Sequence, residues 1–289
     1  MAFSLRTDSG VSSTNGIIPY SLRGGVRALS LEEEIDLHLS SMPPQPAITK
    51  EEIRRKNELT VEYGDYLNNL RLKLVEMKVA DLVKLKDHFI EIITDTENRT
   101  IKIYNKNQPL HINGRIGASM LLREIYECLP KRETRREDLE KLIALLDDNN
   151  NFPIYGTDSD NKLYHRDTLE NSLLLKSNIA KLLAKNVVNL ESPLPVQFNL
   201  VLALKKLSSE MKEEVLARPK FFYSDNFEPI NRALFIALYF YNKNAAEANS
   251  KVKDGSKKLE LISPSTLEEL STALQRSPGQ ILERENLQP

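Results

Sequence analysis

Apolar residues recur three or four positions apart along most of the chain, which is the spacing typical of amphipathic α-helices. The longest such pattern runs from Leu59 to Met77 and continues to Ile92, with a kink expected near Ala80. Shorter helices are predicted where the same spacing recurs, over residues 31–39, 116–129, 139–146, 169–183 and 194–216. The pattern therefore predicts a mainly α protein.

Two helix starts carry a capping-box sequence, in which a Ser or Thr and a Glu three residues later cap each other's backbone amides. The first is Ser30-Leu31-Glu32-Glu33, and the second is Thr49-Lys50-Glu51-Glu52. Pro43, Pro44 and Pro46 stand between the two boxes and are expected to end the first helix, because proline lacks the backbone N–H that a helix interior needs.

One short segment has the alternating pattern of a β-strand. Ile101-Lys102-Ile103-Tyr104 alternates apolar and polar positions after a polar run from Asp95 to Arg99. A single hairpin is marginally stable alone. We therefore predict a small β-hairpin that leans against the helices.

The segment from Pro229 to Tyr241 is apolar on nearly every side. A helix without a polar face is usually the buried centre of its domain, and Pro229 suits a first helical turn. Residues 246–289 are richer in Ser, Thr, Glu and Gln and are expected to form a polar tail.

These patterns suggest four regions. Residues 1–29 are rich in Ser and Gly and are expected to form a flexible tail. A polar loop at 152–162 marks the expected boundary between an N-terminal helical bundle with a small β-hairpin and a C-terminal all-helical domain. The four regions are residues 1–29, 30–150, 163–245 and 246–289.

The amino-acid composition excludes several classes of function. The 289 residues include 40 Lys and Arg against 41 Asp and Glu, and this balance argues against a general nucleic-acid binder. The single cysteine, Cys128, excludes an internal disulfide framework, and the four histidines lie far apart, so we expect no metal site and no cofactor. The strongly apolar stretch Ala233–Tyr241 is too short to span a membrane.

Several short motifs have a plain structural interpretation beside a functional one. His165-Arg166-Asp167 resembles a kinase catalytic loop, but the companion kinase motifs are absent and Asp167 fits a helix cap. The acidic runs at 147–150 and 158–161 lack the Gly and Glu of a calcium-binding EF-hand loop and fit solvated turns. Cys128 fits a small core residue, with a catalytic thiol as the alternative.

A basic cluster stands at a predicted helix start. Lys131, Arg132, Arg135 and Arg136 alternate with Glu133, Glu137 and Asp138. Interleaved charges of this kind favour a solvated face of ion pairs, and a site for an acidic partner is the alternative.

The C-terminal region resembles the translocation signal of Legionella-type IV secreted (Dot/Icm-like) effectors. Glu268 and Glu269, then Glu283 and Glu285, precede Leu287, which stands three residues from the end of the sequence given. The resemblance implies a protein secreted from the bacterium into the host cytosol, with an ordinary polar tail as the alternative.

A second resemblance concerns activity. Leu190-Glu191-Ser192-Pro193-Leu194-Pro195-Val196 opens a hydrophobic helix and is similar to the signature of the Rabex-type (vacuolar-protein-sorting-nine) exchange domain. Arg166-Asp167-Thr168-Leu169 stands upstream at a distance comparable to that family's Pro-Arg-Asp-Lys-Leu. The family opens the nucleotide site of early-endosomal Rab GTPases with an acidic finger that displaces magnesium.

Matched residue by residue, the resemblance places the finger on Glu191, with Pro195 supporting the turn. A later aromatic contact falls near Phe227, before Asn231, with Tyr223 nearby. Glu191 stands where the family has Asp, Ser192 replaces a second acid, and the family's Asn-Pro-Pro segment is missing. A carboxylate suits this chemistry because an anion near Mg²⁺ weakens the binding of the nucleotide to the GTPase. The alternative is that Glu191 is an ordinary residue of a loop before a helix.

The two resemblances imply a secreted bacterial effector that acts through protein–protein binding. The specific hypothesis is a guanine-nucleotide exchange factor for early-endosomal Rab GTPases. The alternative is a non-catalytic helical regulator that binds another effector or a host protein, as inhibitor or scaffold. An enzyme with unrecognised chemistry comes third.

Overall fold

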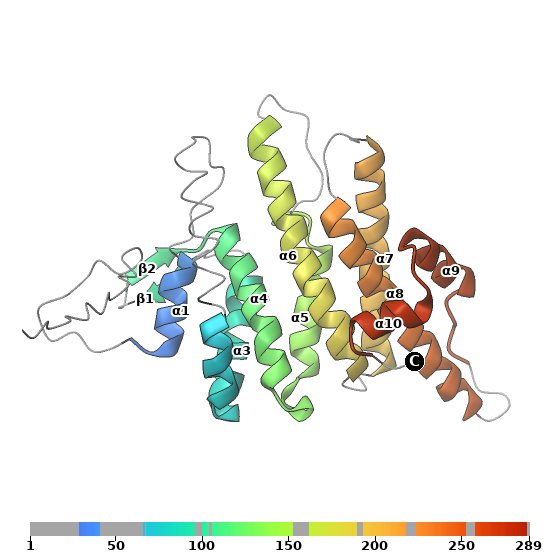
Figure 1. Ribbon diagram of the computed structural model, residues 1–289, viewed down its shortest axis with the longest axis horizontal. Helices are drawn as coiled ribbons and strands as arrows, with labels where there is room; N and C mark the ends of the chain where they lie inside the picture. The colour runs from blue at the N-terminus through green and yellow to red at the C-terminus, as the bar shows by residue number, and fades with distance from the viewer. Residues whose placement is uncertain are drawn as a thin grey trace, which may run out of the picture.

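The structure is a computed structural model, and it confirms a mainly α fold (Figure 1). It describes residues 29–40, 66, 68–95, 100–103, 106–152, 162–189, 193–217, 224–252 and 258–287. Residues 1–28 of the predicted flexible tail, the prolines at 43, 44 and 46, and the second capping box fall outside these ranges. The elements are α1 (Leu31–Ser40), a helical stretch at 68–76, α3 (Val79–Thr94), β1 (Thr100–Ile103), β2 (Lys106–Pro109), α4 (Ile112–Cys128), the 3-10 turn η1 (Lys131–Glu133), α5 (Arg136–Asp147), α6 (Lys162–Asn189), α7 (Leu194–Ala217), α8 (Ser224–Ser250), α9 (Pro264–Ala273) and α10 (Pro278–Arg284).

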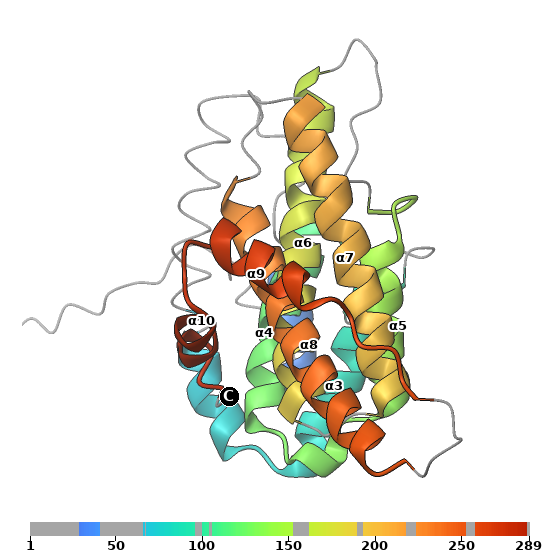
Figure 2. The ribbon, with the colours of Figure 1, turned by 90° about the vertical axis from the view of Figure 1, so that its right-hand side faces the viewer.

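The helices stand side by side in a long array (Figure 1). The hairpin, α1, α3 and α4 form one end, α5 and α6 stand in the middle, and α7, α8, α9 and α10 form the other end (Figures 1 and 2). Helices α4 and α5 pack on α6 and α7, and their buried side chains belong to one hydrophobic cluster. The boundary proposed at 152–162 stays a prediction, although the two sides of it share this core.

Local sequence signals explain how several elements begin. The capping box at α1 is confirmed: the Glu33 amide donates to Ser30 Oγ (3.2 Å), and the Ser30 amide donates to Glu33 Oε2 (3.1 Å). The kink expected near Ala80 is a full break, because helix 68–76 ends before Lys78 and α3 begins at Val79.

The predicted hairpin is also confirmed. Strands β1 and β2 pair antiparallel, with Thr100 opposite Pro109 and Ile103 opposite Lys106. Strand β1 packs against α1, so the hairpin leans on the helices as expected.

Helix α8 is the buried centre of the C-terminal half, as its composition predicts. Every residue from Pro229 to Leu238 is buried, and α6 and α7 pack along it. The helix is longer than predicted, since it begins at Ser224 and reaches Ser250. Pro229 therefore lies inside the helix and not in its first turn.

The described part of the segment predicted as a polar tail, residues 246–252 and 258–287, is folded, which corrects that expectation. It forms α9 and α10, and five of its apolar side chains are buried: Leu270, Leu274, Ile281, Leu282 and Leu287. Its Ser and Gln residues begin α10, where Ser277 and Gln280 form a capping box. The prediction was wrong because it relied on the polar composition of the segment and did not weigh its few apolar residues. None of the described helices is long and apolar enough to cross a membrane.

Two buried lysines reach the ends of neighbouring elements. Lys86 on α3 donates to the Glu133 carbonyl (3.2 Å) and contacts Asp138 at the start of α5. Lys176 on α6 donates to the Leu146 carbonyl (3.0 Å) at the end of α5, and burial lowers the pKa of its ammonium to about 8. These contacts tie α5 to α3 and to α6.

Helix α1 docks through a partly buried ion pair. His88 Nε2 on α3 lies 2.8 Å from Oδ1 of Asp36, which is 2% exposed. Burial of the imidazole opposes its protonation, but the hydrogen bond and charge of Asp36, with Glu32 and Glu91 nearby, outweigh burial and raise the pKa of His88.

This raised pKa predicts a pH-dependent stability. The stabilisation is complete below the unfolded pKa of histidine, about 6.5, and is lost as pH rises through the higher folded value. We therefore expect Asp36→Asn to lower the free energy of unfolding more at pH 5.5 than at pH 8.5, as measured by urea denaturation. Asp81→Asn, on the exposed face of α3, is the control, and an equal loss at both pH values would contradict the assignment.

Close packing of α1 on α4 predicts a second effect. A Cβ at Gly114 would stand 2.8 Å from the Leu39 carbonyl oxygen and would clash with the Leu110 side chain. Gly114→Ala should lower the free energy of unfolding by about 1–3 kcal/mol. Gly279→Ala is the matched control, since no atom lies within 4 Å of its added Cβ. Equal stability of the two variants would contradict the close approach.

Candidate functional site

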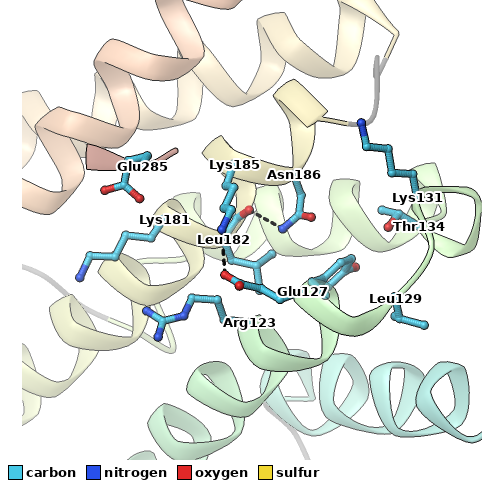
Figure 3. A pocket seen from close by; sticks show the side chains of 11 residues that line it. Arg123, Glu127, Leu129, Lys131, Thr134, Lys181, Leu182, Lys185, Asn186 and Glu285 are labelled. Atoms are coloured by element: carbon cyan, nitrogen blue, oxygen red, sulfur yellow. Dashed lines mark hydrogen bonds and ion pairs between the residues drawn. The ribbon is translucent and has the colours of Figure 1, made fainter. Parts of the chain in front are cut away.

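A cleft of about 320 Å³ opens between α4, α6 and the turn after α10 (Figure 3). The Tyr126 ring, Leu129 and Leu182 form part of its wall. Its charged lining comes from three separate parts of the chain and consists of Arg123, Glu127, Lys131, Lys181, Lys185 and Glu285.

Helical periodicity positions these charges. Arg123 and Glu127 are four residues apart on α4, and Lys181 and Lys185 are four residues apart on α6, so each pair lies on one face of its helix. Because α4 packs on α6, the two faces border the same cleft. Glu285 closes the third side from the turn that follows α10.

The cleft has an excess of positive charge, with four cations against two carboxylates in its lining. Lys185 Nζ pairs with Glu127 Oε1 at 2.8 Å, and Arg123 pairs with Glu124 at 3.0 Å. Glu285 pairs with Arg232 of α8, at 3.1 Å.

Lys181 differs from these charges, because no described carboxylate lies within 4 Å of its ammonium. Figure 3 shows its side chain reaching towards the side of the cleft where Arg123 lies. Burial, with the charges of Arg232 and Arg123, lowers the pKa of Lys181. An anion beside Lys181 and Arg123 would relieve this repulsion, and a guanidinium can bind a carboxylate through two parallel hydrogen bonds.

Cys128 lies beside the cleft on α4 and is half-buried against the core. Burial, with the charges of Glu124 and Glu127, raises the pKa of its thiol. A thiol with a raised pKa is a weak nucleophile at neutral pH, because the thiolate is the reactive form. This environment favours the core interpretation of Cys128 over the catalytic one.

The basic cluster after α4 forms surface ion pairs, whereas Asp138, one of the acids interleaved with it, is buried against Lys86. Arg135 pairs with Asp87 at 2.8 Å, and Arg136 pairs with Glu140 at 2.8 Å. Of that cluster, only Lys131 lines the cleft.

The acidic turn at 147–151 is held by its own residues, since Asp148 Oδ1 accepts from the Asn150 and Asn151 amides. In the described part of the chain, no three His, Cys, Asp or Glu side chains could share a metal ion. The second acidic run, at 158–161, lies outside that part.

The residues singled out for Rab exchange are only partly described. Glu191 and Tyr223 lie outside the described residues. Pro195 is exposed in the first turn of α7, and Phe227 is half-buried near the start of α8. Asn231 is 4% exposed, and its Oδ1 accepts from Ser208 Oγ at 2.6 Å, so it joins α8 to α7.

Helices α7 and α8 run antiparallel, and this separates the predicted residues. Ser208 meets Asn231 at one end of the pair, and Gln197 meets Asn244 (3.0 Å) at the other. Pro195 precedes Ser208 by 13 residues, about 20 Å at 1.5 Å per residue. Pro195 and Asn231 therefore do not share a pocket, although the footprint of one protein partner spans such a distance.

No protein-family model matches the chain, and searches of curated proteins and of solved structures find no similar protein. The assignment of the cleft as a candidate functional site therefore depends on its geometry. Sequence reasoning missed Arg123, Lys181 and Lys185, since charges spaced four apart on separate helices do not reveal which helices pack together. It assigned Glu285 to the translocation signal and not to a cleft.

Proposed function

We propose that the protein acts by binding another protein, and that its cationic cleft accepts an acidic segment of that partner. The observation that carries the proposal is Lys181, whose ammonium has no carboxylate within 4 Å among the described residues and which lies beside Arg123, in a lining with four cations and two carboxylates. A partner carboxylate there gains charge-assisted hydrogen bonds and removes the repulsion between the two cations.

The size of the cleft supports a side-chain ligand on a larger partner. A volume of about 320 Å³ is at the lower end of small-molecule sites, and six of the eleven residues that line the cleft are charged. Charged clefts speed up encounter with partners of opposite charge, and salt screens this effect. Binding should therefore weaken as ionic strength rises.

The wider proposal follows the resemblance to secreted effectors and places the protein in the host cytosol. Glu268, Glu269 and Glu283 are exposed on the C-terminal segment, which leaves them open to a translocation receptor. Leu287 is 7% exposed, so its recognition would require it to leave the core.

The cleft proposal predicts the effect of removing its two facing cations. Arg123→Gln with Lys181→Gln should weaken binding of a fluorescein-labelled hexaglutamate peptide about tenfold, as two ion pairs of about 0.5–1 kcal/mol are lost. Fluorescence polarisation at about 0.05 M and about 0.2 M salt measures both the loss and the screening.

The matched control carries the same charge change elsewhere. Lys84→Gln with Lys251→Gln removes two exposed cations that pair with Asp81 and Glu247 and do not line the cleft. The control should bind like the unmodified chain. An equal loss in both double variants would assign binding to net charge and overturn the role of the cleft.

Rab exchange is the second candidate, and one observation favours it. Helix α7 begins at Leu194, directly behind Pro193, where the resemblance places the start of the hydrophobic helix, and Pro195 is exposed there. We propose that Glu191, three residues before the start of α7 in the sequence, is the acidic finger. Phe227 would then contribute at the far end of a broad footprint.

The exchange candidate predicts that the purified chain accelerates release of fluorescent GDP from endosomal Rab proteins. Glu191→Ala should reduce the acceleration at least tenfold without changing the unfolding midpoint, because the carboxylate supplies the displacing charge. Glu213→Ala, an exposed acid on α7, is the control. A stable complex without any change in GDP release would instead support the non-catalytic regulator.

A further inference from the structure

An extended segment, residues 258–263, is held along helix α8 by two asparagine side chains. The Asn249 amide donates to the Leu259 carbonyl (2.9 Å), and its Oδ1 accepts from the Leu259 amide (2.7 Å). Asn242 makes the same pair of bonds with Ile262, at 2.9 Å and 3.0 Å. Each asparagine thus pairs with both main-chain groups of one residue.

The spacing of the two asparagines matches an extended peptide. Asn242 and Asn249 are seven residues apart, which is about 10.5 Å along a helix. Leu259 and Ile262 are three residues apart, which is about 10 Å along an extended chain. The side-chain amides of Asn242 and Asn249, two helical turns apart, therefore match two residues that are three positions apart in an extended peptide. The peptide runs antiparallel to α8.

All the hydrogen bonds given above go to main-chain atoms of the segment, and a fifth does too: Tyr241 donates its hydroxyl to the Glu260 carbonyl at 3.0 Å. The side chains of the segment contribute little. Leu259 is 41% exposed and Leu261 is 48% exposed, and only Ile262 packs partly against the core. This recognition does not depend on most of the segment's sequence.

We propose that Asn242, Asn249 and Tyr241 form a groove on α8 that binds extended peptides of other proteins through their main chain. The resting chain fills this groove with its own residues 258–263. Main-chain hydrogen bonds supply affinity in such recognition, and side-chain contacts supply selectivity. The expected partner is an extended peptide that has an aliphatic residue at the position of Ile262. At the three positions before it, any side chain is accepted.

The occupying segment belongs to the same chain, so it competes at an effective concentration in the millimolar range. A test must weaken the occupant and leave the groove intact. Leu259→Pro with Ile262→Pro does this in the full chain, because proline removes both N–H donors while the extended backbone remains allowed. The probe is a fluorescein-labelled peptide with blocked ends and the sequence of residues 258–263.

We expect the double proline variant to bind this peptide saturably, and at least tenfold more tightly than the unmodified chain does. Replacing all residues of the peptide except isoleucine by alanine should change the dissociation constant less than about threefold. N-methylation at the positions of Leu259 and Ile262 should weaken binding at least tenfold, since it removes the same two donors.

The groove variant is Asn242→Ala with Asn249→Ala, added to the double proline chain, and it should lose peptide binding. Asn244→Ala is the matched control, because Asn244 lies on the same helix and donates to Gln197 of α7. Binding that survives loss of both asparagines, or that tolerates N-methylation, would overturn the proposal.

A second measurement uses the unmodified chain and does not depend on folding of the proline variant. Millimolar peptide should speed hydrogen exchange at the Leu259 and Ile262 amides, as the added peptide takes their asparagine acceptors. The N-methylated peptide should leave these amides protected. If neither peptide changes their exchange, the segment is a permanent part of the fold and the groove proposal is wrong.

Discussion

The burial of helix α8 is the constraint on which the C-terminal half depends. Its residues from Pro229 to Leu238 are all buried, so neighbours must cover the helix on every side. Helices α6 and α7 cover part of it, and the segment that carries α9 and α10 covers another part. The apolar residues of that segment therefore have a partner surface only because α8 is apolar all round.

Polar side chains on α8 determine which elements cover it. Asn231 and Asn244 face α7, whereas Asn242 and Asn249 face the extended segment. Apolar burial alone is not directional. The buried amide of Asn231 would cost about 1–3 kcal/mol if it lost its partner, so its hydrogen bond with Ser208 favours one arrangement of α7 and α8 over others.

Local signals were sufficient to predict much of the fold. The Ser30 capping box, the alternation at Ile101–Ile103 and the span of α7 each depend on residues close in sequence, and the structure has them. The C-terminal segment was mispredicted because its apolar anchors are spread over two short helices, and their burial depends on α8. The cleft was missed for a related reason, since Arg123 and Lys181 meet only when α4 packs on α6.

The C-terminal segment also sets the charge of the cleft. Glu285 contributes one of the two carboxylates in the lining and pairs with Arg232, which is 8% exposed at its side chain. Arg232 also lies 3.5 Å from Glu228, which pairs in turn with Arg284 of α10 at 3.0 Å. Without the docked segment the cleft would keep its four cations and lose Glu285, and Arg232 would lose its closer partner. A buried cation that loses a carboxylate attracts other anions more strongly. The affinity of the cleft for an acidic ligand is thus coupled to the same packing that covers α8.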